Sequence, residues 1–188
     1  MVTQHSGLPM CPRTPSRTPR PVSAGLAAAL LLLLIVACSG HAVGAPWRFA
    51  VVCDTRGSIS KPGEEGSVDG VRTSVLGPMA KAIAAEGVDL VVFPGDAVTG
   101  IATSGPLTTQ LRRWRASMAP VYDAGIPVYA IRGNHETYHA GALTAWREVM
   151  TDIPRDGPLG EEGLTYKVDH QNARFVAFDC YVGRAASY

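Results

Sequence analysis

Three apolar runs in the sequence end in residues that can hold a metal ion or move a proton. Asp54 follows the first run, Asp96 follows the second, and Asn134 and His135 follow the third. Carboxylate, amide and imidazole groups suit Mn²⁺, Fe or Zn²⁺. A carboxylate can bridge two metal ions about 3.5–4 Å apart, and such pairs activate water for attack on phosphorus. The three run ends therefore predict one metal-dependent site.

Each side chain has a role that its chemical type permits. Gly95 lets the backbone approach closely, so Asp96 is the candidate bridge between two ions. Asn134 offers a neutral amide oxygen, and His135 could protonate a leaving alkoxide. Arg56 follows the first run as well, and two interpretations are open: it contacts a phosphate group, or it pairs with a carboxylate.

The elements that must position these residues alternate between strands and helices. Apolar, β-prone runs predict strands at residues 47–53, 88–93 and 126–131, and helical spacing predicts helices at 71–86 and 107–124. This order predicts a parallel sheet. Because the carboxyl ends of parallel strands meet at one edge, the polar residues that follow them are expected to lie together.

The rest of the chain predicts a short helix at residues 142–150 and a hairpin formed by 164–168 and 173–178. In the first long helix, apolar residues at Val71, Val75, Met79 and Ile83, with their neighbours, show helical spacing. In the second, the residues expected to face the core are Leu111, Trp114, Met118 and Val121.

The ordered set of motifs resembles the calcineurin-like metallophosphoesterase superfamily. The Gly-Asn-His-Glu form at residues 133–136 and the hairpin are similar to its purple-acid-phosphatase-like members. The resemblance implies an α/β fold, a four-layer α/β/β/α sandwich around a dinuclear metal site. Residues 46–188 would form its N-terminal half to two-thirds. The family's later Gly-His-x-His motif does not occur in the sequence, so a truncated family member is expected.

The resemblance also implies a role for each residue. Asp54 would bind the first metal, Asp96 would bridge, Asn134 would bind the second, and His135 would assist the leaving group. The implied cofactors are two divalent or trivalent ions, Mn, Fe or Zn. The implied substrate is a phosphate mono- or diester, hydrolysed by a metal-activated water.

Two positions depart from the family pattern. Arg56 stands where the family usually has a histidine ligand, and Thr99 stands where purple acid phosphatases supply a tyrosine. The first metal therefore lacks a usual ligand, and an inactive remnant or a lipid-anchored binding module is an alternative to a phosphoesterase.

A further alternative is a zinc metalloprotease, because residues 135–139 match H-E-x-x-H. That motif requires a continuous helix through His135 and His139.

The first 45 residues predict a secretory signal. A basic segment without acidic residues precedes a short apolar core, which is too short for a comfortable membrane-spanning helix. The core leads into Ala-Cys-Ser at residues 37–39, which resembles a bacterial lipobox with lipidation at Cys38. The alternatives are ordinary cleavage after Ala42 or Ala45, or an uncleaved membrane anchor. Under the signal interpretations the mature domain, residues 46–188, is exported as a membrane-anchored lipoprotein or as a periplasmic or extracellular protein.

Composition narrows the possible partners. The 188 residues carry a net charge of +1, which gives no electrostatic reason to expect nucleic acid as a partner. The four cysteines form no zinc-type pair. Cys53 and Cys180 lie in apolar runs and are predicted to be buried thiols, with a disulfide between them as the alternative.

Overall fold

The computed structural model describes residues 45–58 and 66–182. Residues 1–44 of the predicted signal, with the candidate lipidation site at Cys38, lie outside the described residues. Among the helices that the structure describes, none combines the length and apolar character needed to cross a membrane.

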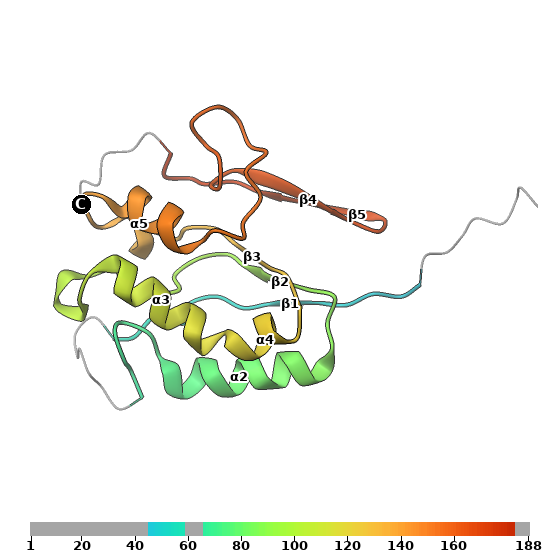
Figure 1. Cartoon of the computed structure of the whole chain (residues 1–188), viewed down its shortest axis with the longest axis horizontal. Helices are drawn as coiled ribbons and strands as arrows, with labels where there is room; N and C mark the ends of the chain where they lie inside the picture. The colour runs from blue at the N-terminus through green and yellow to red at the C-terminus, as the bar shows by residue number, and fades with distance from the viewer. Residues whose placement is uncertain (1–44, 59–65, 183–188) are drawn as a thin grey trace, which may run out of the picture. The chain divides into compact units, whose positions relative to one another are not determined.

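A parallel sheet of three short strands forms the centre of the domain (Figure 1). Its strands are β1 (Phe49–Val51), β2 (Leu90–Phe93) and β3 (Val128–Ala130). The sheet order is β1-β2-β3, with Ala50 opposite Val91 and Val92 opposite Tyr129. Parallel strands in the predicted order are thereby confirmed, and their carboxyl ends lie at one edge.

The connections between strands are helical, as predicted. In chain order the α-helices are α2 (Thr73–Glu86), α3 (Leu107–Ser117), α4 (Ala119–Asp123) and α5 (Ala142–Val149). Short 3-10 helices span Ala102–Ser104 and His135–Thr137. The predicted helix 107–124 divides into α3 and α4 because Pro120, in the first turn of α4, has no N–H to continue the ladder of α3.

The core lies between the sheet and the helices. Leu111, Trp114, Met118 and Val121 are all fully buried, as predicted. Trp114 packs edge-on against Phe93 of β2, with ring centroids 4.7 Å apart.

In helix α2, the buried face is formed by the neighbours of Val75 and Met79. Leu76 and Ala80 are buried, whereas Val75 and Met79 are 46% and 38% exposed. A helix with apolar residues at neighbouring positions can bury either face, and packing against the other elements decides which one.

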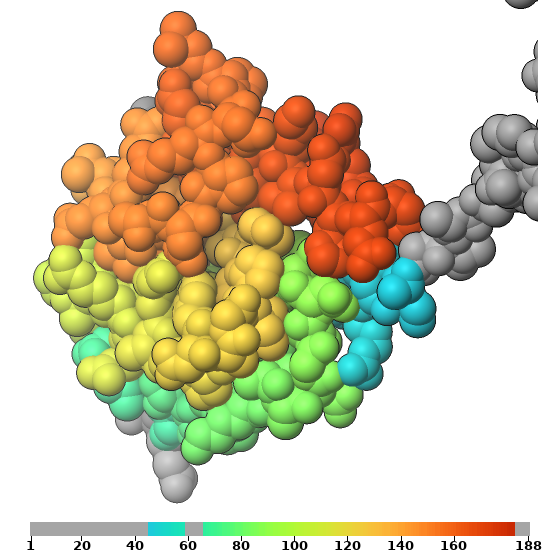
Figure 2. All heavy atoms as spheres, turned by 45° about the vertical axis from the view of Figure 1, so that its right-hand side comes forward, coloured from blue at the N-terminus to red at the C-terminus, as the bar shows by residue number. Residues whose placement is uncertain are grey.

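A β-hairpin covers part of the sheet. Its strands are β4 (Tyr166–His170) and β5 (Ala173–Ala177), joined by a two-residue turn. The Tyr166 hydroxyl donates a hydrogen bond to the carbonyl of Ala130 at 2.8 Å, and Phe175 packs edge-on against Phe49 of β1. Figure 2 shows these later residues, orange to red, gathered on one side of the molecule, and the helical residues, green to yellow, on another.

A buried ion pair ties the hairpin to the end of β3. Arg132 Nε lies 2.6 Å from Asp179 Oδ2, and the two side chains are 6% and 0% exposed. The other oxygen of Asp179 accepts the N–H of Tyr181. Because Arg132 directly precedes residues 133–136, this pair fixes the place where that segment begins.

The prediction of two buried thiols was wrong. Cys53 and Cys180 are both exposed and free. Exposure alternates along this segment: Val51 is exposed, Val52 is buried, and Cys53 lies on the same outward face as Val51.

The Arg132–Asp179 pair generates a prediction for stability. We expect Asp179→Ala to lower the free energy of unfolding by about 3–5 kcal/mol, because it leaves the Arg132 charge buried without its partner. Asp169→Ala is the matched control, since it removes an exposed carboxylate that pairs with Arg174. Chemical denaturation followed by circular dichroism measures both. Equal effects of the two changes would contradict the role given to the buried pair.

Candidate active site

The loops after β1 and β2 run side by side. The Asp54 N–H donates to the carbonyl of Gly95 and the Arg56 N–H donates to the carbonyl of Asp96, both at 3.2 Å. These backbone bonds continue the pairing of β1 with β2 beyond the sheet. The polar residues of the first two run ends are thereby brought together, as the sequence predicted.

The loops after β2 and β3 touch through glycines. A Cβ atom on Gly95 would lie 2.5 Å from the nitrogen of Gly133, and one on Gly133 would lie 2.1 Å from Asp96 Oδ1. Asp54 and Asp96 both have positive φ, 55° and 59°, a conformation that aspartate adopts more readily than most residues. The backbone conformation therefore sets the direction in which both carboxylates leave the strand ends.

Glu136 fastens the second and third loops to each other. Its carboxylate accepts hydrogen bonds from the N–H groups of Asp96, Val98 and Gly133, at 3.0, 3.1 and 2.7 Å. The side chain is fully buried, and this burial raises the pKa of Glu136 to about 7 against the opposing effect of the three N–H donors. Glu136 thus holds the framework of the site. Sequence reasoning missed this role, because the residue type alone does not distinguish a buried clamp from a ligand.

Asp96 lies at the centre of the cluster. Its Oδ2 is 3.4 Å from Arg56 Nε and 3.7 Å from His135 Nε2, while its Oδ1 faces the backbone N–H of His135 at 3.4 Å. The Asp96 side chain is 15% exposed and that of Arg56 is 35% exposed. Of the two interpretations open for Arg56, the structure shows the ion pair with a carboxylate.

The ring of His135 is held in one tautomer. Its Nδ1 lies 2.6 Å from the backbone carbonyl of Thr99, and a carbonyl can only accept, so Nδ1 carries a proton. Nε2 is then the nitrogen that can gain or lose a proton beside Asp96. The side chain is 4% exposed, which limits competing contacts with solvent.

Asn134 is oriented by its neighbour. Its Nδ2 donates to the hydroxyl of Tyr138 at 2.6 Å. The amide oxygen Oδ1 is therefore the atom that can bind a cation. Asp54 is exposed, and its hydrogen bond with the Cys53 thiol is the first cause of a raised pKa of that thiol.

The H-E-x-x-H alternative lacks the helix it requires. The segment forms only a three-residue 3-10 helix, His135–Thr137, and His139 lies beyond it. Glu136, the base of that motif, is committed to three backbone donors. The geometry therefore disfavours a zinc protease site.

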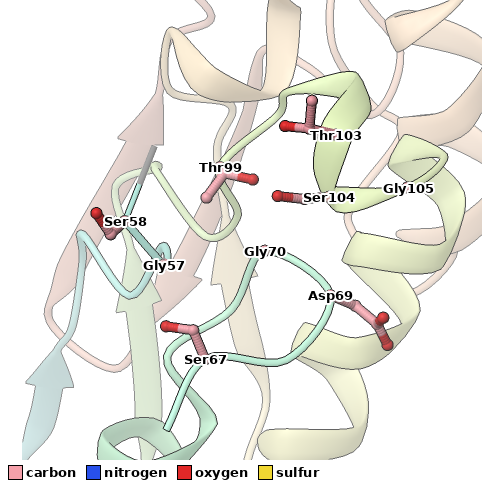
Figure 3. Close-up of a pocket in the computed structure, with 9 residues that line it drawn as sticks. All are labelled: Gly57, Ser58, Ser67, Asp69, Gly70, Thr99, Thr103, Ser104 and Gly105. Carbon is pink, nitrogen blue, oxygen red and sulfur yellow. The ribbon is translucent and has the colours of Figure 1, made fainter. Parts of the chain in front are cut away.

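A hydroxyl-rich cavity of about 430 Å³ borders the site (Figure 3). Gly57 and Ser58 of its lining directly follow Arg56, and Thr99 comes three residues after Asp96. Thr99, at the position where purple acid phosphatases supply a tyrosine, lines this cavity. Its side chain is 1% exposed, and its hydroxyl donates a hydrogen bond to Gln110. The lining residues are Gly57, Ser58, Ser67, Asp69, Gly70, Thr99, Thr103, Ser104 and Gly105.

The oxygen donors of the site and one fixed cation meet at Asp96. Asp54, Asp96 and Asn134 supply oxygen donors suited to a hard or intermediate cation. Within residues 45–58 and 66–182, no group of three or more His, Cys, Asp or Glu side chains is arranged to hold an ion. An ion on the Arg56 side of Asp96 would meet the like charge of the guanidinium, because Arg56 Nε lies 3.4 Å from Asp96 Oδ2.

The contact between Gly95 and Gly133 generates a second prediction. We expect Gly133→Ala to lower the free energy of unfolding by about 1–3 kcal/mol, because the new methyl group displaces Asp96. Gly77→Ala is the matched control, since a Cβ there meets nothing within 4 Å and alanine favours the helix. Thermal denaturation compares the two variants. A Gly133 variant as stable as the Gly77 variant would show that the loops do not meet as described.

Two solved structures are similar to this chain. Among solved structures, a dimetal phosphatase from Danio rerio is similar, with a TM-score of 0.49 and 20% identity, covering 72% of this chain and 44% of its own. A purple acid phosphatase from yellow lupin (Lupinus luteus) seeds is similar with a TM-score of 0.44 and 18% identity, covering 74% and 26%. The chain thus spans less than half the length of either protein.

No curated protein matched the sequence. The family model described as calcineurin-like phosphoesterase matches residues 48–176, from the start of β1 almost to the end of β5. The match includes all the strand-end residues of the site. The chain belongs to the calcineurin-like phosphoesterase family.

Proposed function

We propose that this chain contributes the active site of a metal-dependent phosphoesterase that hydrolyses phosphate mono- or diesters. The observation that carries the proposal is the convergence on Asp96: Arg56 and His135 both approach one oxygen of its carboxylate. Such a combination of a carboxylate, a fixed cation and a proton donor suits a reaction in which negative charge develops on phosphate oxygens.

Metal binding in this proposal uses the oxygen donors at the sheet edge. Asp96 and Asn134 would hold an ion of Mn, Fe or Zn, with Asp54 nearby. When bound, the ion would supply positive charge that attracts a phosphate oxygen and makes water more acidic.

The chain's own residues act around the phosphate. Arg56 is charged at every working pH and can donate two parallel hydrogen bonds to a phosphate group. His135, with Nδ1–H fixed on the carbonyl of Thr99, can present a proton on Nε2 to the leaving oxygen. Glu136 keeps the loops that carry Asp96 and His135 at a constant separation.

The neighbouring cavity supports a hydrophilic leaving group. Its lining of serine and threonine hydroxyls with one carboxylate offers hydrogen bonds to an alcohol such as a polyol (Figure 3). We therefore propose esters of hydroxylated alcohols as the substrate class.

The central test is the substitution of the proposed metal-binding carboxylate. We expect Asp96→Asn to lower kcat/KM by about 100-fold or more with Mn²⁺ present, because a neutral amide replaces the anionic donor. Asp123→Asn, which changes an exposed aspartate at the end of α4, is the control and should retain full activity. Hydrolysis of glycerol phosphate and of bis(4-nitrophenyl) phosphate measures both ester types. Absence of hydrolysis by the unchanged protein would refute the proposal.

The role of His135 predicts a dependence on the leaving group. His135→Asn keeps an amide donor for the carbonyl of Thr99 but removes the proton source. We expect it to reduce kcat by about 100-fold or more for glycerol phosphate, whose alkoxide needs a proton. The loss should be much smaller for 4-nitrophenyl phosphate, whose phenolate leaves unaided. Equal losses on the two substrates would assign His135 a purely positional role.

Export and membrane anchoring stay predictions from the sequence. A lipid on Cys38 would hold the phosphoesterase domain at a membrane surface, outside the cytoplasm. Cys38 and the apolar core before it lie outside the described residues.

A further inference from the structure

We propose that Arg56 takes the place of one metal ion, so that this chain binds a single divalent ion at Asp96 and Asn134. The guanidinium group then serves as the second fixed positive charge for a phosphate ester. The idea rests on the proposed function and defines the cofactor requirement of that same site.

The first argument is the position of the guanidinium. Arg56 Nε lies 3.4 Å from Asp96 Oδ2, and among the described residues this buried nitrogen has no hydrogen-bond partner. The backbone holds it there: the Arg56 N–H donates to the carbonyl of Asp96, and Arg56 forms an isolated β-bridge with Val71. The charge is therefore anchored on one side of the carboxylate.

The second argument is chemical. An arginine has five N–H donors, no acceptor atom and a pKa too high to lose its proton, so it cannot ligate a cation. A divalent ion on the same side of Asp96 would face a like charge at short range. Thr99 offers no replacement ligand, because its side chain is fully buried and donates to Gln110. The Arg56 side of the site therefore takes an anion.

The third argument is that the guanidinium remains accessible. The Arg56 side chain is 35% exposed although its Nε is buried, so the end of the side chain reaches the surface of the site. A planar guanidinium matches the geometry of two phosphate oxygens. The amide nitrogen of Asn134 donates to the Tyr138 hydroxyl, so its amide oxygen is the atom available for an ion.

Counting bound metal tests the proposal without any enzymatic assay. The 188-residue chain is titrated with Mn²⁺ by isothermal calorimetry, and its metal content is measured by elemental analysis after dialysis. We expect one equivalent for the unchanged protein. Two equivalents, or none, would overturn the proposal, and this first result does not depend on the folding of any variant.

Substitution of Arg56 tests whether this residue limits the number of bound metal ions to one. Arg56→His replaces the fixed charge with a group that can ligate, and we expect a second equivalent of Mn²⁺. Arg113→His is the matched control: it makes the same change at another arginine whose Nε pairs with an aspartate, Asp69, at 2.9 Å. The control should bind one equivalent. If a folded Arg56→His protein also binds one, Arg56 does not set the number of ions.

Inorganic phosphate provides a second measurement. With Mn²⁺ saturating, Arg56→Gln should weaken phosphate binding about tenfold or more, through loss of charge-assisted hydrogen bonds. Unchanged phosphate affinity would overturn the anion-binding role of Arg56. These readouts separate the two proposals. A protein that shows the expected metal counts and phosphate affinities but hydrolyses no ester would refute the proposed function and leave the inference about Arg56 intact.

Discussion

The site depends on one buried carboxylate. Glu136 accepts the backbone N–H groups of Asp96, Val98 and Gly133, and so joins the loops that follow β2 and β3. Burial disfavours the charged form of the Glu136 carboxyl group, and the three backbone N–H donors offset part of this effect. Because the loop after β1 pairs with the loop after β2, all three strand ends share one framework. The spacing of the reactive side chains follows from this single clamp.

Much of the architecture could be predicted from the sequence, for a physical reason. Alternating apolar strands and helical patterns dictate parallel strands, and parallel strands bring their carboxyl ends to one edge. Asp54, Asp96 and His135 therefore come together although they are distant in the chain. The predicted core of α3 and α4, including Trp114, was also confirmed, since a wide apolar stripe leaves one way to bury it.

Other features could not be predicted from the pattern of residue types. The buried face of α2 depends on packing, which buries Leu76 and leaves Val75 46% exposed. The exposure of Cys53 depends on which face of β1 is covered, and Cys53 lies on the same face as the exposed Val51. The partner of Arg56 depends on side-chain geometry: the sequence left open a phosphate or a carboxylate, and the structure shows the ion pair with Asp96. The metal-binding roles of Asp54, Asp96 and Asn134 stay predictions.

The contact between Gly95 and Gly133 has a consequence for how such a site can evolve. The positions that hold the loops together exclude any side chain, since even a methyl group would collide with backbone or with Asp96. The positions that carry the chemistry, such as residue 56, project from that framework and can change without rebuilding it. A change at residue 56 would therefore alter the charge beside Asp96 while the contact between the two loops stays in place.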